Sequence, residues 1–258
     1  MVICMQNYKY KAIVAYDGTD FYGWQIQPLQ KTIVGTLQNT FKTVFKQQIK
    51  ILGSSRTDAG VHAIGQVFSF ACSLCIPVNK MTEAWNAALP VSITIRSLQR
   101  VADTFHPQHN VGYKTYCYYL FYRKPLPHAA RYGLYCGAID IIRLRDALQC
   151  MVGEHDFRPL SVVMPAYIKT VRRVDSIRII KNPIKGSYAI VVCGKGFLRY
   201  MVRRMIGAAL ECARGRCSQE YIKQVLQNSI IINKLPVAPP QGLFLVRIVY
   251  TNKAIKLS

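Results

Sequence analysis

Runs of β-forming residues alternate with segments of helical periodicity along the chain, and this alternation constrains the fold more than any other feature. Residues 8–16 are rich in β-formers and end at Asp17-Gly18, which predicts a strand that runs into a turn. The apolar residues that then recur at the spacing of one helix face are Leu37, Phe41, Val44 and Phe45. A strand followed by a helix with a single apolar face predicts a sheet with helices packed on it.

The same pattern continues to the end of the chain. Further strands are expected at residues 49–52, 66–70, 93–101, 113–122, 171–180, 188–193 and 243–250. Further helices are expected at residues 82–89, 140–153 and 197–215, and after a cap at Ser218. The economical architecture is α+β, with two α+β halves whose largely antiparallel sheets are joined across a central cleft. The boundary falls within residues 105–110, which predicts an N-terminal subdomain of residues 1–108 and a C-terminal subdomain of residues 109–258.

Basic residues greatly outnumber acidic ones. The chain has 34 Lys and Arg against 12 Asp and Glu, a formal net charge of +22. Residues 1–108 hold 10 basic and 5 acidic residues, and residues 109–258 hold 24 and 7, so the C-terminal subdomain carries +17 of the charge. A surface of that sign attracts polyanions and binds nucleic acid phosphates with a strong salt dependence. An anionic membrane surface and a merely solvated basic face are the alternatives.

The compartment and the metal content can be predicted from what the sequence lacks. No segment reaches the roughly 18 uninterrupted apolar residues of a spanning helix, and the start MVICMQNYKYK lacks the apolar region of a signal peptide, so we expect a cytoplasmic protein without a membrane partner. Nine irregularly spaced cysteines are typical of reduced thiols. Cys72 and Cys75 form a CxxC motif, but no second pair or nearby His stands at ligand spacing, so we expect no zinc and no other metal.

One acidic residue stands in an unusual place. Asp58 lies in the stretch SSRTDAGVHA, after an apolar run and between a basic residue and an Ala-Gly turn. A loop after a strand can present such a carboxylate at the mouth of a cleft. Gly60 allows tight backbone geometry beside it, and Arg56 can pair with the carboxylate and keep it ionised. On spacing alone a simple turn explains the sequence equally well, so a catalytic acid and a structural turn both stay open here.

A longer stretch carries a family resemblance. SSRTDAGVHAIGQVFSF resembles the signature GRTDAGVHA-x-GQV of the tRNA pseudouridine synthase I family (TruA). Other matches follow in the family's order: AYDGTDFYGWQIQP at 15–28, NAALP at 86–90, FH at 105–106, YKTYCYYL at 113–120, MVRR at 201–204 and APPQGLFLV at 238–246. Because these separate motifs occur in register along almost the whole chain, the resemblance is specific.

The resemblance implies the pseudouridine synthase fold and an isomerase that needs no cofactor or metal. Such an enzyme breaks the bond between ribose C1′ and uracil N1, turns the base and rejoins it through C5. The implied targets are the uridines at positions 38, 39 and 40 in the anticodon stem-loop of tRNA, and the implied assembly is a homodimer. The alternative is a noncatalytic tRNA-binding protein of the same fold, which would keep the basic surface but lose the acid.

A metal-dependent nuclease or phosphatase is a third possibility from another class of enzyme. It would need several acids to hold a cation. The acids in the first hundred residues are Asp17, Asp20, Asp58 and Glu83. So few acids make a poor cluster of metal ligands.

The family's roles transfer to matching positions of this sequence. Asp58 would be the catalytic carboxylate, either as a nucleophile toward sugar or base or as a base on C2′. Arg56 would pair with Asp58 and move into the RNA when a base is flipped. Tyr116 would pack against the target base, and an inward strand aromatic is its alternative. Arg203 would bond the catalytic Asp, and a solvated helix cation is its alternative. The residues expected to hold phosphates are Lys195, Arg199 and Arg204.

The sequence also departs from the family pattern at three places. Ser55 replaces the usual Gly before RTDAG, Gln108 stands where an Arg often follows FH, and Arg158-Pro159 stands after His155-Asp156-Phe157, where many members of the family have small polar residues. These departures bear on RNA contacts and target range more than on the reaction. His62 and His106 are expected to be hydrogen-bonding residues, with no role in proton transfer.

Overall fold

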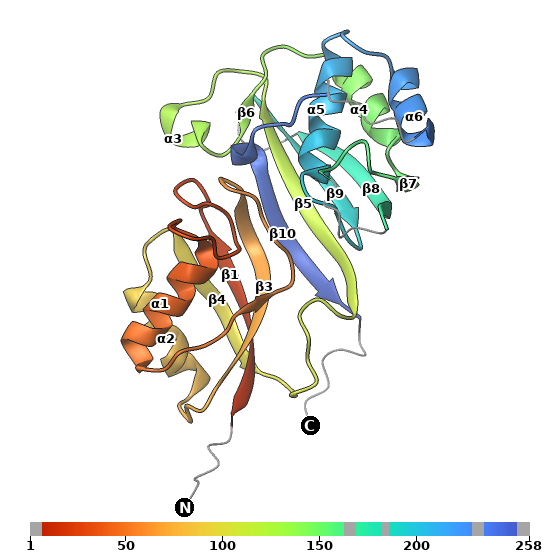
Figure 1. Cartoon of the computed structure of the whole chain (residues 1–258). Coiled ribbons are helices and arrows are strands. Elements are labelled where there is room, and N and C mark those ends of the chain that lie inside the picture. The colour runs from red at the N-terminus through yellow and green to blue at the C-terminus, as the bar shows by residue number, and fades with distance from the viewer. Residues whose placement is uncertain (1–6, 163–168, 182–185, 229–234, 252–258) are drawn as a thin grey trace, which may run out of the picture. The chain divides into compact units, whose positions relative to one another are not determined.

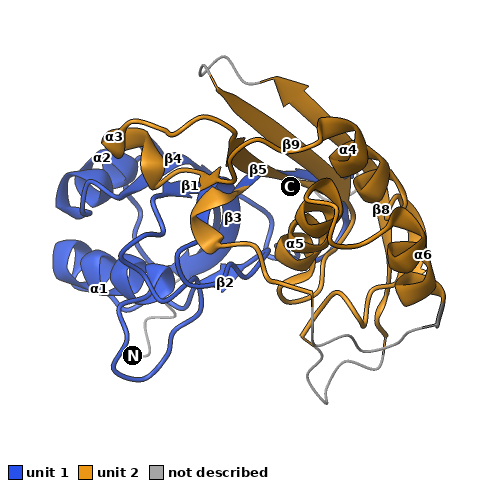
Figure 2. Ribbon diagram, turned by 90° about the horizontal axis from the view of Figure 1, so that it is seen from above, with its two compact units in different colours: residues 1–112, 245–258 blue, residues 113–244 orange. Residues whose placement is uncertain are grey.

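The computed structural model describes residues 7–162, 169–181, 186–228 and 235–251. The chain divides into two compact units (Figure 2). Unit 1 comprises residues 1–112 and 245–258, and unit 2 comprises residues 113–244. The first division falls close to the expected boundary between residues 108 and 109, whereas the C-terminal segment, expected in the second subdomain, groups with unit 1. The two predicted subdomains as such stay a prediction.

Unit 1 is built on an antiparallel arrangement of strands. The strands are β1 (Tyr8–Tyr16), β2 (Leu52–Gly53), β3 (His62–Cys72), β4 (Ile93–Arg100) and β10 (Leu243–Tyr250). Their order is β4-β1-β3-β10, with the short β2 paired to β3. β1 pairs antiparallel with both β3 and β4, and both ladders have a register irregularity near the end of β1. The turn that leaves β1 therefore starts beside the beginning of β3.

Two helices cover one face of this sheet (Figure 1). They are α1 (Ile33–Phe45) and α2 (Val78–Ala88). Phe41 of α1 and Trp85 of α2 meet edge to face with ring centroids 4.9 Å apart, and both pack on Phe70 of β3 at 5.5 Å. Thr32 caps α1, since its hydroxyl accepts from the Gly35 amide at 3.3 Å. The predicted strand at 8–16 and the predicted helical face after it are confirmed.

The strands of unit 2 also pair largely antiparallel. The strands are β5 (Val111–Phe121), β6 (Leu134–Tyr135), β7 (Gly153–Asp156), β8 (Val171–Lys181) and β9 (Ser187–Gly194). They run in the order β5-β9-β8-β7 with antiparallel pairing, and β6 adds to β5 in parallel. The helical elements are α3 (Pro127–Ala130), α4 (Ile141–Gln149), α5 (Met201–Ala213), α6 (Gln219–Asn228) and the 3₁₀ turn η1 (Pro240–Gly242). The predicted α+β class with largely antiparallel sheets is confirmed.

Helix α5 is the central helix of unit 2. All of its residues except Arg204 and Glu211 are buried. A side chain at Gly207 would place Cβ against the Pro236 carbonyl, so this glycine lets the segment before β10 run directly along the helix. The helix therefore carries Arg203 inside the unit and not on its surface.

The predicted start of this helix at residue 197 is wrong by one turn. The helix begins at Met201, and Tyr200 before it has a left-handed backbone with φ of 61°. Leu198 is buried and Phe197 packs on Tyr116, but both do so from an irregular segment. These two apolar residues are buried by tertiary contacts, and their spacing in the sequence resembles one more turn of the helix. The predicted strand at residues 49–52 is likewise reduced to Leu52–Gly53.

Candidate active site

Asp58 lies on a tight turn between β2 and β3. The Val61 amide donates to the Asp58 carbonyl at 3.2 Å, and Gly60 has φ of 75°, a conformation that favours glycine. Asp58 is half-buried, and Arg56 two residues earlier is exposed. A structural turn and a functional acid are therefore compatible at this position, because the turn fixes the position of the Asp58 backbone.

A second loop supports this turn from one side. It is the segment between β1 and α1, which contains the motif at residues 15–28. The Trp24 amide donates to the Thr57 carbonyl at 3.1 Å, and the hydroxyls of Tyr16 and Thr57 lie 2.8 Å apart. Gly23 has φ of 84°, and a Cβ there would lie 2.6 Å from the Thr57 carbonyl oxygen. The two loops are packed so closely that only glycine fits at this point.

A buried histidine joins the same two loops. His62 is fully buried, and its Nδ1 lies 3.1 Å from Asp17 Oδ1 and 3.2 Å from the Gly18 amide nitrogen. One ring nitrogen cannot donate to the carboxylate and accept from the amide at once, and the bond to the carboxylate is the stronger of the two. Asp17 also accepts from the amide and hydroxyl of Thr19 at 3.0 and 2.6 Å. Asp17 therefore stabilises the turn after β1 through these hydrogen bonds.

Ser55 and Gln108, two of the departures from the family pattern, take part in hydrogen bonds near β2 and β3. The buried Gln66 donates from Nε2 to the Ser55 carbonyl at 2.7 Å. Gln108 donates from Nε2 to the Gly53 carbonyl at 2.9 Å. A backbone carbonyl is available whatever the residue, so Ser55 can replace Gly without loss of this bond. Gln108 ties the chain near residue 108 to β2.

Tyr116 is buried in unit 2. It lies on β5, is 6% exposed, and meets the ring of Phe197 edge to face with centroids 5.2 Å apart. The alternative interpretation, an inward strand aromatic, fits this burial. Residues two apart on a strand share a face, so Tyr116 shares one with Lys114 and Tyr118.

Arg203 is also buried, which makes the alternative of a solvated helix cation wrong. Its side chain is 9% exposed and donates from Nε to the Ala238 carbonyl at 2.7 Å. The guanidinium carbon lies 4.9 Å from the ring centroid of Tyr200. Tyr118 on β5 donates to the neighbouring Pro239 carbonyl at 2.8 Å. Three motifs of the sequence, around residues 116, 203 and 238, thus meet inside unit 2.

The three residues expected to hold phosphates differ in exposure. Lys195 and Arg199 are exposed, and Arg199 lies over the Tyr200 ring at 5.1 Å. Arg204 is half-buried, and its Nε is a buried donor without a hydrogen-bond partner in the part of the chain that the structure describes. Lys195 and Arg199 are therefore better placed than Arg204 to meet a phosphate in solution.

Sequence reasoning missed Lys114 as a site candidate. Burial lowers the pKa of Lys114 to about 8, which makes proton loss near neutral pH much easier than for an exposed lysine. The residue lies inside the motif YKTYCYYL, two positions before Tyr116. The sequence predicts that Lys114 lies in a strand, but its burial depends on elements that are distant in sequence.

Among the residues that the structure describes, no three His, Cys, Asp or Glu side chains come together as metal ligands. Within the same ranges, every helix is too short or too polar to cross a membrane.

A family model described as tRNA pseudouridine synthase matches residues 12–110 and 147–251, which is most of the chain. The chain belongs to the tRNA pseudouridine synthase family. It is an isomerase that converts uridine to pseudouridine in tRNA, and its α+β architecture is the pseudouridine synthase fold. The resemblance drawn from the RTDAG motif and its companions is confirmed.

Curated relatives match the sequence of this chain along nearly their whole length. The tRNA pseudouridine synthase A of Maridesulfovibrio salexigens is 35% identical over 242 residues, which covers 93% of this chain and 89% of the relative. The enzyme of the same name from Thermodesulfovibrio yellowstonii is 32% identical and covers 93% of this chain and 98% of the relative. A tRNA pseudouridine synthase A 2 from Clostridium perfringens is 35% identical with the same coverage. This synthase family therefore accounts for both units of the chain.

Proposed function

We propose that the enzyme isomerises the uridines at positions 38, 39 and 40 of the tRNA anticodon arm, with Asp58 as its catalytic carboxylate. The observation that carries the proposal is the support of the Asp58 turn. Contacts from Tyr16, Gly23 and Trp24 hold Thr57, and the Gly60 amide donates to the Phe21 carbonyl at 3.2 Å. A carboxylate on a turn that is held at the residue before it and again two residues after it is pre-positioned for chemistry. The target positions rest on the resemblance of the motifs.

The reaction defines what the carboxylate must do. Pseudouridine forms when the bond between C1′ and N1 breaks and a bond between C1′ and C5 forms, so C5 loses a proton and N1 gains one. No electrons are exchanged with an outside group, which is consistent with a site built from amino acids alone. Asp58 acts either as a nucleophile or as a base on C2′, and both roles need it ionised.

The other site residues act on the same uridine in this proposal. The family resemblance gives Arg203 the role of keeping Asp58 ionised through its positive charge, and within unit 2 the bond from its Nε to the Ala238 carbonyl fixes the plane of the guanidinium. Tyr116 offers its ring to the uracil. The exposed Arg56 moves into the RNA when the base leaves the stack.

The basic surface supplies the affinity for tRNA. Lys195, Arg199 and Arg204 contact phosphates, and most of the +22 net charge acts as a diffuse attraction. The proposal includes a homodimer in the cytoplasm, for which the family resemblance is the support.

Replacement of Asp58 tests the proposal. Asp58→Asn should form no pseudouridine in a single turnover that the wild type completes, while tRNA binding stays within about tenfold because phosphate contacts dominate affinity. Asp103→Asn, an exposed acid of the same unit, is the matched control and should keep the wild-type rate. The measurement is chemical mapping of pseudouridine in tRNA beside filter binding. A normal rate for Asp58→Asn would remove the catalytic assignment, and pseudouridine outside positions 38–40 would remove the target assignment.

A further inference from the structure

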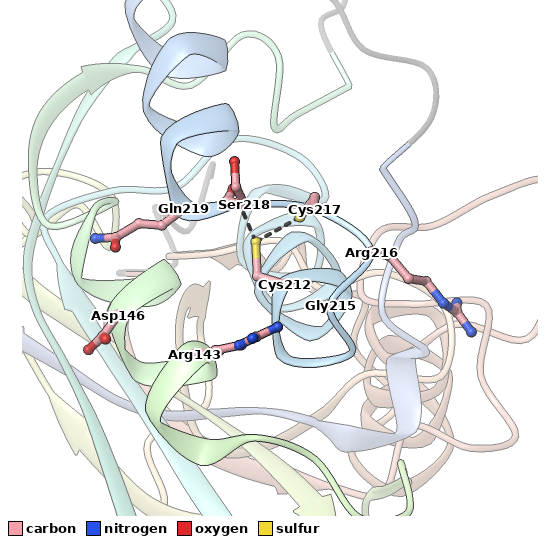
Figure 3. A pocket seen from close by; sticks show the side chains of 8 residues that line it. All are labelled: Arg143, Asp146, Cys212, Gly215, Arg216, Cys217, Ser218 and Gln219. Atoms are coloured by element: carbon pink, nitrogen blue, oxygen red, sulfur yellow. Dashed lines mark hydrogen bonds between the residues drawn. The ribbon is translucent and has the colours of Figure 1, made fainter.

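Two cysteines meet at the end of helix α5. Cys212 lies in the last turn of the helix and Cys217 lies just before Ser218, the residue whose hydroxyl accepts from the Tyr221 amide at the start of α6. Their Sγ atoms are 2.7 Å apart, and both cysteines are free thiols (Figure 3). The sulfur atoms of a disulfide are about 2.05 Å apart, so a bond between them needs a shift of less than about 1 Å.

The backbone brings the two thiols together. Gly215 between them has φ of 74°, and its amide donates to the Cys212 carbonyl at 2.9 Å. The chain therefore turns back at once after α5, and Cys217 returns beside Cys212. Because this turn is local and hydrogen-bonded, the two sulfur atoms stay neighbours without help from distant parts of the fold.

Small molecules can reach the pair. The two cysteines line a pocket of about 520 Å³ together with Arg143, Asp146 and Gln219 (Figure 3). Cys217 is half-buried, whereas Cys212 is almost fully buried. A reagent in the pocket therefore meets Cys217 before Cys212.

The charges around the pair are mixed. Glu211 accepts from both Arg214 and Arg216 at 3.2 and 3.3 Å, and Arg143 pairs with Asp140 at 3.4 Å. Burial and the neighbouring Cys217 raise the pKa of Cys212, so Cys212 stays a thiol near neutral pH. Proximity and the access of Cys217 are thus the features that favour reaction.

We propose that Cys212 and Cys217 form a reversible disulfide when a hydroperoxide oxidises the enzyme. The sulfur of Cys217 attacks the O–O bond of hydrogen peroxide, which yields a sulfenic acid and one water. The sulfur of Cys212 then displaces the hydroxyl group and loses its proton, which yields the S–S bond and a second water. Two electrons pass from the thiols to the peroxide, and a dithiol reductant later restores both thiols by exchange with the disulfide.

The order of the two steps follows from exposure. Cys217 is the first to be oxidised because it is the more exposed of the two, and Cys212 resolves the sulfenic acid because its sulfur is already in contact. Cys150 is a competitor, since Gln219, which lines the same pocket, donates from its side-chain amide to the Cys150 sulfur at 2.9 Å. The proposal requires that the main disulfide of Cys217 forms with Cys212 and not with Cys150.

Peptide mapping of the full-length enzyme tests the proposal without any assay of isomerisation. Trypsin cuts after Arg204, Arg214, Arg216 and Lys223, so the two cysteines fall on separate peptides, residues 205–214 and 217–223. After treatment with hydrogen peroxide and blocking of free thiols, these peptides should appear joined, and dithiothreitol should separate them. Thiol titration after unfolding in denaturant, where the buried Cys212 is also counted, should give two fewer free thiols than the untreated enzyme.

Three variants supply the controls. Cys212→Ser and Cys217→Ser should each abolish the joined peptides, whereas Cys75→Ser, an exposed thiol of unit 1, should leave them unchanged. Circular dichroism confirms that each variant is folded, and the wild-type result stands even if one is not. Peptides joined through Cys150, or Cys217 oxidised to sulfinic acid with no joined peptide, would overturn the proposal.

Discussion

Arg203 is the residue whose side-chain geometry, as well as charge, we expect to affect the reaction rate. The residue is 9% exposed, and its guanidinium donates from Nε to the Ala238 carbonyl, so both the position and the plane of the guanidinium are fixed. Lysine keeps the charge but not the planar set of donors. We expect Arg203→Lys to lower the single-turnover rate by about 10- to 100-fold, which corresponds to about 1.4–2.7 kcal/mol. tRNA binding should stay within about threefold of the wild type, because phosphate contacts dominate affinity.

Arg199→Lys is the matched control at this scale. Arg199 is exposed four residues before Arg203 and lies over the same Tyr200 ring. Its replacement should leave the rate at saturating tRNA unchanged. If Arg203→Lys turned over normally but bound tRNA poorly, Arg203 would be a phosphate contact and would leave the proposed catalytic set.

At the scale of the element, the loop between β1 and α1 is a support for the Asp58 turn. A Cβ at Gly23 would lie 2.6 Å from the Thr57 carbonyl and would also strain a backbone with φ of 84°. Gly23→Ala should therefore displace the Asp58 turn, lower the single-turnover rate by more than about tenfold and cost about 1–3 kcal/mol of unfolding free energy. Single-turnover kinetics and urea unfolding measure the two effects.

Gly137→Ala separates strain from displacement. Gly137 also has a positive φ, 69°, but a Cβ there would meet no atom within 4 Å. This variant should lose about 1–2 kcal/mol of stability and keep the wild-type rate. Equal loss of rate in both variants would mean that strain alone, and not displacement of Asp58, slows the reaction.

At the scale of the whole molecule, the net charge of +22 should govern affinity for tRNA. If about five phosphates are neutralised, a fourfold rise in salt should lower the binding constant by about two orders of magnitude, because each contact releases counterions. Filter binding across a salt series gives the slope. A nearly flat titration would show that the charge is only a solvated face.

A double variant assigns part of that slope. Lys195→Gln with Arg199→Gln should reduce the slope of log binding constant against log salt by about 1.5, since each phosphate contact contributes about 0.7–0.9. Lys80→Gln, an exposed lysine of unit 1 that pairs with Glu83 at 3.0 Å, should leave the slope unchanged. A smaller slope in this control alone would move the RNA contacts to unit 1.

The sequence by itself determined the features that depend on near neighbours. The strand at residues 8–16 and the apolar face of α1 could be read from spacing, because alternation and helical periodicity repeat within a few residues. The Asp58 turn could be read because Gly60 lies two positions away. The family could be recognised because short motifs keep their order along the chain.

Only the tertiary structure decided which of these residues are buried and what holds them. Arg203 looked equally well like a surface cation, since its partner Ala238 lies 35 residues away. The support of the Asp58 turn by Tyr16 spans 41 residues, and the pairing of His62 with Asp17 spans a similar distance. Such contacts leave no periodic signal in the sequence. They depend on how the elements pack, which also explains why the apolar residues just before α5 imitated a helix.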